Sequence, residues 1–225
     1  MSVAHSAASE SHTATTGSAN QAAFSWTHTQ TGTPQGVLIF VYTFNSVTAL
    51  VTSVTYGGLA LTAVSGGSAT DTAGEPGRID TYFLGTGLGT GNQTITVNRT
   101  NNATVMYATA ATVLAKYDTE VYTPGIVLLS GDGTMPVQSV TDGWPGSFSQ
   151  RYAGAYSGLA TPPAAGTGNT LLNNIDIGNY GAAMVRETTP GQGPRNVGFN
   201  AATDYRAAAH LAIREINPRR VVLYT

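Results

Sequence analysis

Histidine is the side chain best suited to proton transfer or metal binding near neutral pH, and this chain of 225 residues contains four. His5 and His12 lie in an N-terminal segment of low complexity, whereas His28 and His210 are far apart in the sequence. None of them has the spacing of a zinc ligand set. We therefore expect His210 to be a strand histidine whose ring is satisfied by its neighbours, with a metal or catalytic role as the alternative.

Carboxylates offer two further kinds of chemistry. Ca²⁺ prefers six or more oxygen ligands, and a calcium site could combine the acid of Gly131-Asp132-Gly133 with Asp71, Glu75 and Asp80. No regular Asp-x-Asp-x-Asp run is present, so the sequence favours acids that sit in turns or pair with arginine, as Asp80 could with Arg78. A carboxylate pair of the kind that hydrolyses glycosides remains compatible with the sequence.

Aromatic and glycine-rich segments complete the candidates. Trp144, Tyr152 and Tyr156 could stack on sugar rings, and packing in a core or an interface is the alternative. The run from Gly85 to Gly91 has the composition of a phosphate-binding loop, but such loops open a helix and a strand pattern follows here. No nucleophile, base and acid stand out as a set. We therefore expect no catalytic residues, no metal ligands and no cofactor, and a protein that is not an enzyme.

The elements that would position these side chains are β-strands, and the clearest is a hairpin over residues 51–64. Gly57-Gly58 can place both central residues at φ > 0, which primed two-residue turns require. That turn predicts the register of the hairpin. The expected pairs are Tyr56 with Leu59, Val54 with Leu61 and Thr52 with Ala63 on one side, and Thr55 with Ala60 and Ser53 with Thr62 on the other.

Further strands are expected wherever apolar or alternating runs occur. Residues 36–44 form a continuous apolar run, which predicts a strand covered on both faces. Alternation over residues 23–29 places Phe24, Trp26 and His28 on one face, with His28 at its rim. Residues 65–77 read as a long exposed loop. The other expected strands are 78–84, 93–99, 104–114, 126–129, 137–141, 147–157, 180–187 and 207–216, the last with an alanine-rich helix as its alternative.

The domain organisation follows from composition. Residues 1–22 are rich in Ala, Ser and Thr and could not bury a core of their own. They are either a disordered tail or an arm docked against another part of the structure, such as a neighbouring subunit, and we expect the docked arm. Residues 23–225 are expected to form one β-sandwich domain, in which residues 218–225 are a C-terminal tail strand that pairs on an edge. The fold class is therefore all-β, an antiparallel sandwich with an extended N-terminal arm.

The charge content restricts the partners. Charged residues make up 10% of the chain, where soluble domains average about 25%. A surface this neutral indicates that much of it is covered by copies of itself or by a neighbour. The net charge of −2, with no basic cluster longer than Arg219-Arg220, argues against nucleic acid. No apolar run approaches the roughly 20 residues of a membrane helix and no secretory signal is evident, so we expect a soluble protein without a membrane partner; the absence of Cys excludes disulfides.

The order of the short motifs resembles jelly-roll-like domains of tailed-phage virion proteins. Their hairpin of the type V-T-Y-G-G-x-A-L-T is found here at Val54 to Thr62, and their D-T-Y-F-L strand at Asp80 to Leu84. The glycine turn corresponds to Gly85 to Gly91, the Q-T-I-T-V strand to Gln93 to Val97, and the closing A-I-R strand to Ala212 to Arg214. The resemblance spans roughly residues 24–216, and it carries no catalytic residue.

Such proteins include capsid decoration (cement) proteins, head fibres and tail or baseplate components, and they are often trimeric. The resemblance therefore implies a jelly-roll-like virion structural protein. Within that group we expect a decoration protein on the capsid surface, a homotrimer that binds the major capsid protein and stabilises the assembled head. The alternative is a tail-fibre, baseplate or carbohydrate-binding β-sandwich module that uses Trp144 and nearby tyrosines for host attachment.

Overall fold

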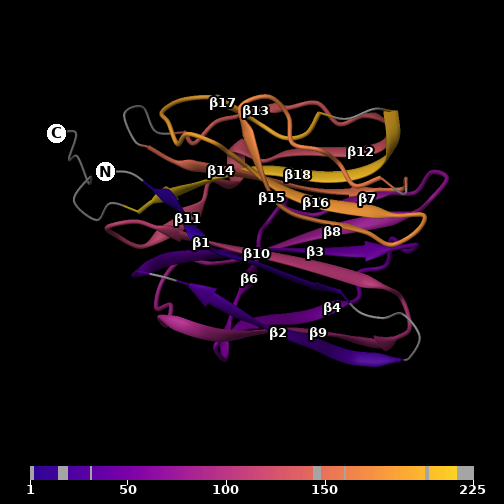
Figure 1. Ribbon diagram of the computed structural model, residues 1–225, viewed down its shortest axis with the longest axis horizontal. Helices are drawn as coiled ribbons and strands as arrows, with labels where there is room; N and C mark the ends of the chain where they lie inside the picture. Colours follow the sequence, from indigo (N-terminus) through magenta and orange to yellow (C-terminus); the bar gives the residue numbers. More distant parts are fainter. Residues whose placement is uncertain are drawn as a thin grey trace.

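The computed structural model describes residues 3–14, 20–30, 32–143, 148–159, 161–200 and 203–216. The chain is all-β, as expected, and its strands stack as antiparallel sheets (Figure 1). The strands are β1 (Ala4–Ala14), β2 (Gln21–Gln30), β3 (Pro34–Phe44), β4 (Val51–Tyr56), β5 (Leu59–Ala60), β6 (Thr62–Ala63), β7 (Ala69–Asp71), β8 (Gly77–Leu84), β9 (Gly91–Asn102), β10 (Met106–Leu114), β11 (Thr119–Val121), β12 (Val127–Thr134), β13 (Gln138–Val140), β14 (Gln150–Ser157), β15 (Asn169–Asp176), β16 (Gly181–Glu187), β17 (Arg195–Val197) and β18 (Thr203–Glu215). A single 3₁₀ turn, η1, spans Thr123–Gly125 within these described ranges.

Three sheets form the body of the molecule. The middle sheet has the order β1-β10-β3-β8-β6, with β7 also paired to β8. The upper sheet has the order β11-β18-β14-β16-β15, with β12 also paired to β18, and the lower sheet has the order β2-β9-β4-β5. The two-stranded sheet β13-β17 lies over the outer side of the upper sheet, at the top of Figure 1. The expected sandwich is thus a stack of sheets in which the middle sheet is covered on both faces.

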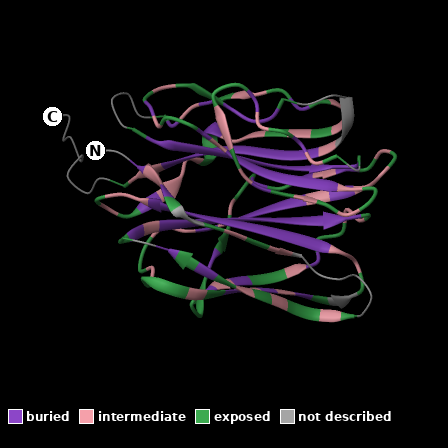
Figure 2. Cartoon of the chain, in the orientation of Figure 1, coloured by how far each residue is buried: buried purple, intermediate pink, exposed green. Residues whose placement is uncertain are grey.

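Strand β3 shows why the middle sheet lies at the centre. Its continuous apolar run sends alternate side chains to opposite faces, as any strand does. Leu38, Phe40 and Tyr42 enter the core toward the upper sheet, and Val37, Ile39 and Val41 enter the core toward the lower sheet. All six are fully buried, which confirms the expected strand with both faces covered (Figure 2).

The hairpin at Gly57-Gly58 is confirmed at its turn and wrong beyond it. Both glycines have positive φ, 55° and 85°, and Tyr56 pairs with Leu59 and Thr55 with Ala60. Leu61 still donates its N–H to Val54 at 2.9 Å. The expected pairs of Thr62 and Ala63 with β4 do not form, because these residues are β6 and pair with Phe83 and Tyr82 of β8. The chain crosses from the lower to the middle sheet at Leu61, whose side chain is buried in the core between them.

Several other expectations need correction. The alanine-rich segment near the C-terminus is a strand, β18, rather than a helix. Residues 65–77 are not all exposed loop, because they contain the short strand β7 with Ala69 and Asp71 buried. Strand β15 falls in a region where no strand was expected. The expected tail strand at 218–225 lies outside the described residues.

The N-terminal segment is part of the fold. Strand β1 pairs with β10 along the edge of the middle sheet, with a register shift between His5 and Glu10. Val3 and Ser6 are buried. Residues 4–14 are thus docked, as expected, and the strand on which they dock, β10, belongs to the same chain.

Candidate functional site

Strand β1 is tied by side chains to the upper sheet. The His5 ring lies 2.9 Å from the Tyr152 hydroxyl through Nδ1 and 2.7 Å from Glu10 Oε1 through Nε2. The His5 backbone N–H donates to Gln150 Oε1 at 3.2 Å. His5 therefore has a structural role at the junction of β1 and β14.

The same strand is tied to the lower sheet by a second set of contacts. Trp26 Nε1 donates to the Ser11 hydroxyl at 2.7 Å, and that hydroxyl lies 2.7 Å from His28 Nδ1. Because the indole N–H can only donate, the Ser11 hydrogen is available for His28 Nδ1. One short strand thus joins all three sheets.

His28 and His210 are both fully buried, so the expectation that His28 lies at a sheet rim is wrong. His210 donates from Nδ1 to the Val127 carbonyl at 3.2 Å, and its ring packs against Phe199. Burial lowers the pKa of each ring to about 4, so both are neutral at pH 7. The Nδ1 contact agrees with the interpretation of His210 as a strand histidine held by a neighbour, whereas its buried Nε2 has no hydrogen-bond partner among the described residues.

These two rings should make the folded state sensitive to mild acid. In the unfolded chain each histidine would titrate near 6.5, so protons bind the unfolded state first as the pH falls from 6.5 toward 4. The stability each neutral ring contributes is present above pH 6.5 and is lost over that window. We expect about 2 kcal/mol less unfolding free energy per histidine at pH 5 than at pH 7.5, measured by urea denaturation. In the His28→Gln, His210→Gln double variant the slope over this range should flatten; an equally steep slope would contradict the assignment.

The four acids of the candidate calcium site have separate roles. Asp80 forms a two-point ion pair with Arg78, at 2.7 and 2.6 Å, which confirms the predicted pairing. Asp71 is buried, where its Oδ1 accepts the Ala73 N–H, and burial raises its pKa. Glu75 accepts the Tyr180 hydroxyl at 2.9 Å, and Asp132 is exposed. Within the described ranges no three metal-ligating side chains gather.

Tyr152 and Tyr156 do not form the exposed aromatic surface that could have stacked on sugar rings. Tyr152 and Tyr156 are fully buried, so they serve packing, the alternative interpretation. The Tyr156 hydroxyl donates to the Glu75 carbonyl at 2.8 Å. Trp144 lies outside the described residues.

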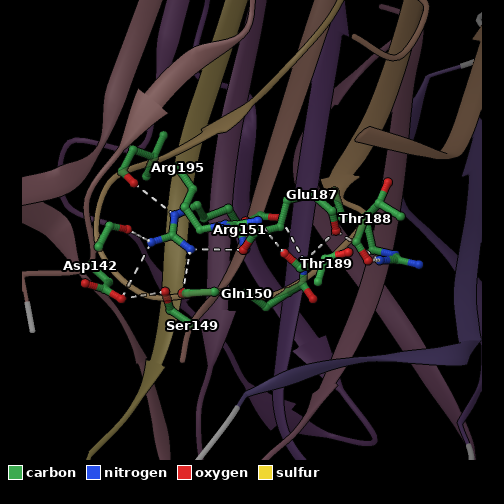
Figure 3. A network of polar contacts seen from close by, with 12 residues as sticks. Asp142, Ser149, Gln150, Arg151, Glu187, Thr188, Thr189 and Arg195 are labelled. Carbon is green, nitrogen blue, oxygen red and sulfur yellow. Dashed lines mark hydrogen bonds and ion pairs between the residues drawn. The ribbon is translucent and has the colours of Figure 1, made fainter. Parts of the chain in front are cut away.

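The most extensive polar cluster surrounds Arg151, which is the largest fully buried side chain of the described part of the molecule (Figure 3). Its guanidinium donates to Glu187 Oε1 at 3.0 Å and lies 3.6 Å from Asp142 Oδ2. The other donors reach the carbonyls of Val140, Gly191 and Gly193. Arg151 thereby holds the loop between β16 and β17 against the upper sheet.

Glu187 is shared between two arginines. Arg195 Nε donates to Glu187 Oε2 at 2.9 Å, and the Arg195 side chain is 41% exposed. Burial raises the pKa of Glu187, against the opposite effect of the two arginines. A polar pocket of about 360 Å³ opens beside Glu187 and Arg195. Since Arg195 also donates to the Thr189 carbonyl at 3.1 Å, its charge and donors are used within the protein, and the cluster is an anchor for the loop.

None of the buried residues of this cluster could be assigned by sequence reasoning. Arg151 stands in an ordinary polar context, and its partners Asp142 and Glu187 come from other parts of the chain. The burial of every residue of β14, which makes the charge of Arg151 unusual, is evident only in the structure. A buried charge must be paired, so the burial of Arg151 implies partners but does not identify them.

The exposed side of the lower sheet carries a second feature that the sequence did not single out. We call it the neutral face: a set of outward side chains, exposed or half-buried, namely Ser25, Thr27, Thr29, Ser53, Thr55, Thr94, Thr96 and Asn98 (Figure 2). Thr27 pairs with Thr94, and Thr96 lies between Ser25 and Thr55. The strands of this sheet contain one Lys, Arg, Asp or Glu, which is Arg99. Its side chain is buried and donates to the Thr104 carbonyl at 2.7 Å, so the face itself carries no charge.

No helix among the described residues is long and apolar enough to cross a membrane.

Comparison of the chain with protein-family models, with curated proteins and with solved structures finds no match in any of the three. Functional conclusions therefore depend on the residues and their geometry.

Proposed function

We propose that the chain is a structural protein of a tailed-phage virion, a jelly-roll-like decoration protein that binds the outside of the assembled head. Its partners would be the major capsid protein and further copies of itself in a homotrimer. The proposal is supported by the order of the sequence motifs, by the low charge content and by the β-sheet architecture.

The neutral face is the observation that carries the proposal. Burying charged side chains against a partner is costly because ions lose their hydration, whereas hydroxyl and amide groups need only new hydrogen bonds. Eight such groups stand side by side on three paired strands, with Asn98 Nδ2 donating to Ser53 Oγ at 2.9 Å and Thr29 Oγ1 to Asn92 Oδ1 at 2.7 Å. This surface suits a broad contact with a neutral, hydrogen-bonding protein surface such as that of a capsid shell.

The position of β1 changes how the shell would be held. Strand β1 pairs with β10 of its own sheet, so the proposal does not require residues 4–14 as a clamp on a neighbouring subunit. The contact is assigned instead to the neutral face, which is held rigid by the core between the lower and middle sheets. Binding to the assembled shell but not to free capsid subunits would stabilise the head by mass action.

A charge placed on the neutral face tests the proposal. Thr94→Lys puts an ammonium at an exposed position on β9, where burial against the shell would leave it unpaired. We expect at least about tenfold weaker binding to empty, expanded phage heads in co-sedimentation. Thr134→Lys is the matched control, an exposed strand threonine on β12, and should bind as the parent does.

The oligomeric state is the second measurement. Light scattering should show a trimer for the parent chain and for both variants. A monomeric parent that does not sediment with heads contradicts the proposed function, as does equal binding by Thr94→Lys and the parent.

A further inference from the structure

A pocket of about 650 Å³ lies where β3 ends. Its walls come from three connections far apart in the sequence, and it is lined by Phe44, Asn45, Ala103, Thr104, Val105, Ile177 and Tyr180. Ile177 and Tyr180 belong to the turn between β15 and β16, which is closed by the Ile177 N–H donating to the Tyr180 carbonyl at 2.9 Å. The volume falls within the range of pockets that hold small organic ligands.

The aromatic wall of this pocket is held in place by its surroundings. The Tyr180 ring packs on Phe44 with centroids 5.8 Å apart and on Tyr156 at 6.3 Å. The Tyr180 hydroxyl donates to Glu75 Oε2 at 2.9 Å, and burial together with Glu75 raises the Tyr180 pKa to about 12. Phe44 and Tyr156 are themselves buried, so they fix the half-buried Tyr180 ring, and that preformed ring is the aromatic surface that a ligand meets.

The lining favours an uncharged ligand. None of the seven lining residues is Lys, Arg, Asp, Glu or His. The nearby Glu75 carboxylate accepts a hydrogen bond from Tyr180, and the nearby Arg99 donates to the Thr104 carbonyl. An anion would find no cation on these walls, and a cation no carboxylate.

The same lining combines apolar surface with an amide. Asn45 is exposed and is the one non-glycine residue with positive φ, 53°, among the residues that the structure describes. Its side chain brings both a donor and an acceptor to a pocket otherwise made of rings, aliphatic groups and one threonine. A ligand that matches is a ring with an apolar face and a hydrogen-bonding rim.

We propose that this end pocket, bounded by Phe44, Asn45 and Tyr180, binds a neutral saccharide. A pyranose presents C–H groups on one face, which pack on aromatic rings, and hydroxyls around its edge, which pair with an amide. The site is separate from the neutral face and does not depend on the role proposed for that face. The proposed saccharide site is therefore not the one considered from the sequence, which consisted of Trp144, Tyr152 and Tyr156.

Saturation-transfer NMR with the full-length protein tests the site. The probes are glucose, galactose, N-acetylglucosamine, maltose, cellobiose and lactose, with benzyl alcohol as an apolar probe and glucuronate as a charged one. We expect transfer to at least one neutral sugar, strongest at the protons of one ring face. Tyr180→Ala should raise the dissociation constant at least about tenfold, and Asn45→Ala should also raise it.

Tyr117→Ala is the matched control, because Tyr117 is half-buried and lies away from the end pocket, beside Lys116. It should bind as the parent does, and circular dichroism should show all three variants folded. Ile177→Trp, which fills the pocket from its own wall, provides a second blocking variant if Tyr180→Ala does not fold. The proposal is overturned if no neutral sugar gives transfer, if only benzyl alcohol or glucuronate binds, or if sugar binding survives the blocking variants.

Discussion

Removing residues 1–14 should unfold the protein rather than trim it. The deletion takes away the strand that pairs with β10, and with it the buried Val3 and the hydrogen bonds of His5 and Ser11. Each lost hydrogen bond contributes about 1 kcal/mol, and Trp26 Nε1 would lose its partner. We expect a loss of more than about 5 kcal/mol of unfolding free energy, comparable with the whole stability of many domains. Urea denaturation followed by circular dichroism measures it.

A peptide that consists of residues 1–14 provides the control for this deletion. Added in excess, it should restore the denaturation midpoint, because it can pair with β10 as the truncated chain refolds. Ser11→Ala is a milder version, which leaves Trp26 Nε1 unpaired and should cost about 1–3 kcal/mol. A truncated chain with the parent's midpoint would show that β1 is an arm on the surface, as the composition alone suggested.

Arg151→Met should be the most damaging single substitution in the upper sheet. It leaves Glu187 and Asp142 buried without their shared cation and removes the guanidinium donors from the carbonyls of Gly191 and Gly193. Breaking a buried ion pair from one side costs about 3–5 kcal/mol. Chemical denaturation measures the loss, and limited proteolysis should cut the loop between β16 and β17 in the variant before the parent.

Two comparisons separate the buried charge from simple packing. Arg195→Met removes the more exposed partner of Glu187 and should cost less than about 1 kcal/mol. In the double variant Arg151→Met, Glu187→Gln, the loss should be smaller than the sum of the two single losses, because one of the two buried carboxylates that Arg151 neutralised is gone. Additive losses, or an Arg151→Met variant as stable as Arg195→Met, would contradict the role assigned to the network.

The strands were predictable where their own side chains form the core. The apolar run of β3 and the alternation of Ile95 and Val97 on β9 indicate burial directly. Gly57-Gly58 predicts the turn of the hairpin. The predictions that failed concern segments whose pairing depends on residues far away in the sequence. Strand β1 has no apolar side chain larger than alanine, and its attachment depends on contacts with residues such as Trp26 and Tyr152.

The candidate sites were harder to predict for the same reason. Thr62 and Ala63 leave the hairpin because β8 offers them a partner, which no local pattern reveals. The end pocket combines Phe44 at the end of β3 with Tyr180 in the turn between β15 and β16. Arg151 is matched to Glu187 only after β14 and β16 have paired. Local patterns therefore predict strands, and the sites arise where strands from distant segments meet.

The placement of β1 has a consequence for how the protein is made. A ribosome makes β1 before its partners, because β10 follows about 90 residues later and Tyr152 later still. At about 5–20 residues per second, β1 waits for several seconds without a partner. Unpaired strands are aggregation hazards when they are hydrophobic, and the Ala, Ser and Thr composition of β1 makes it a poor nucleus. The composition that hides the strand from sequence analysis thus suits a segment that must stay soluble until its place in the sheet exists.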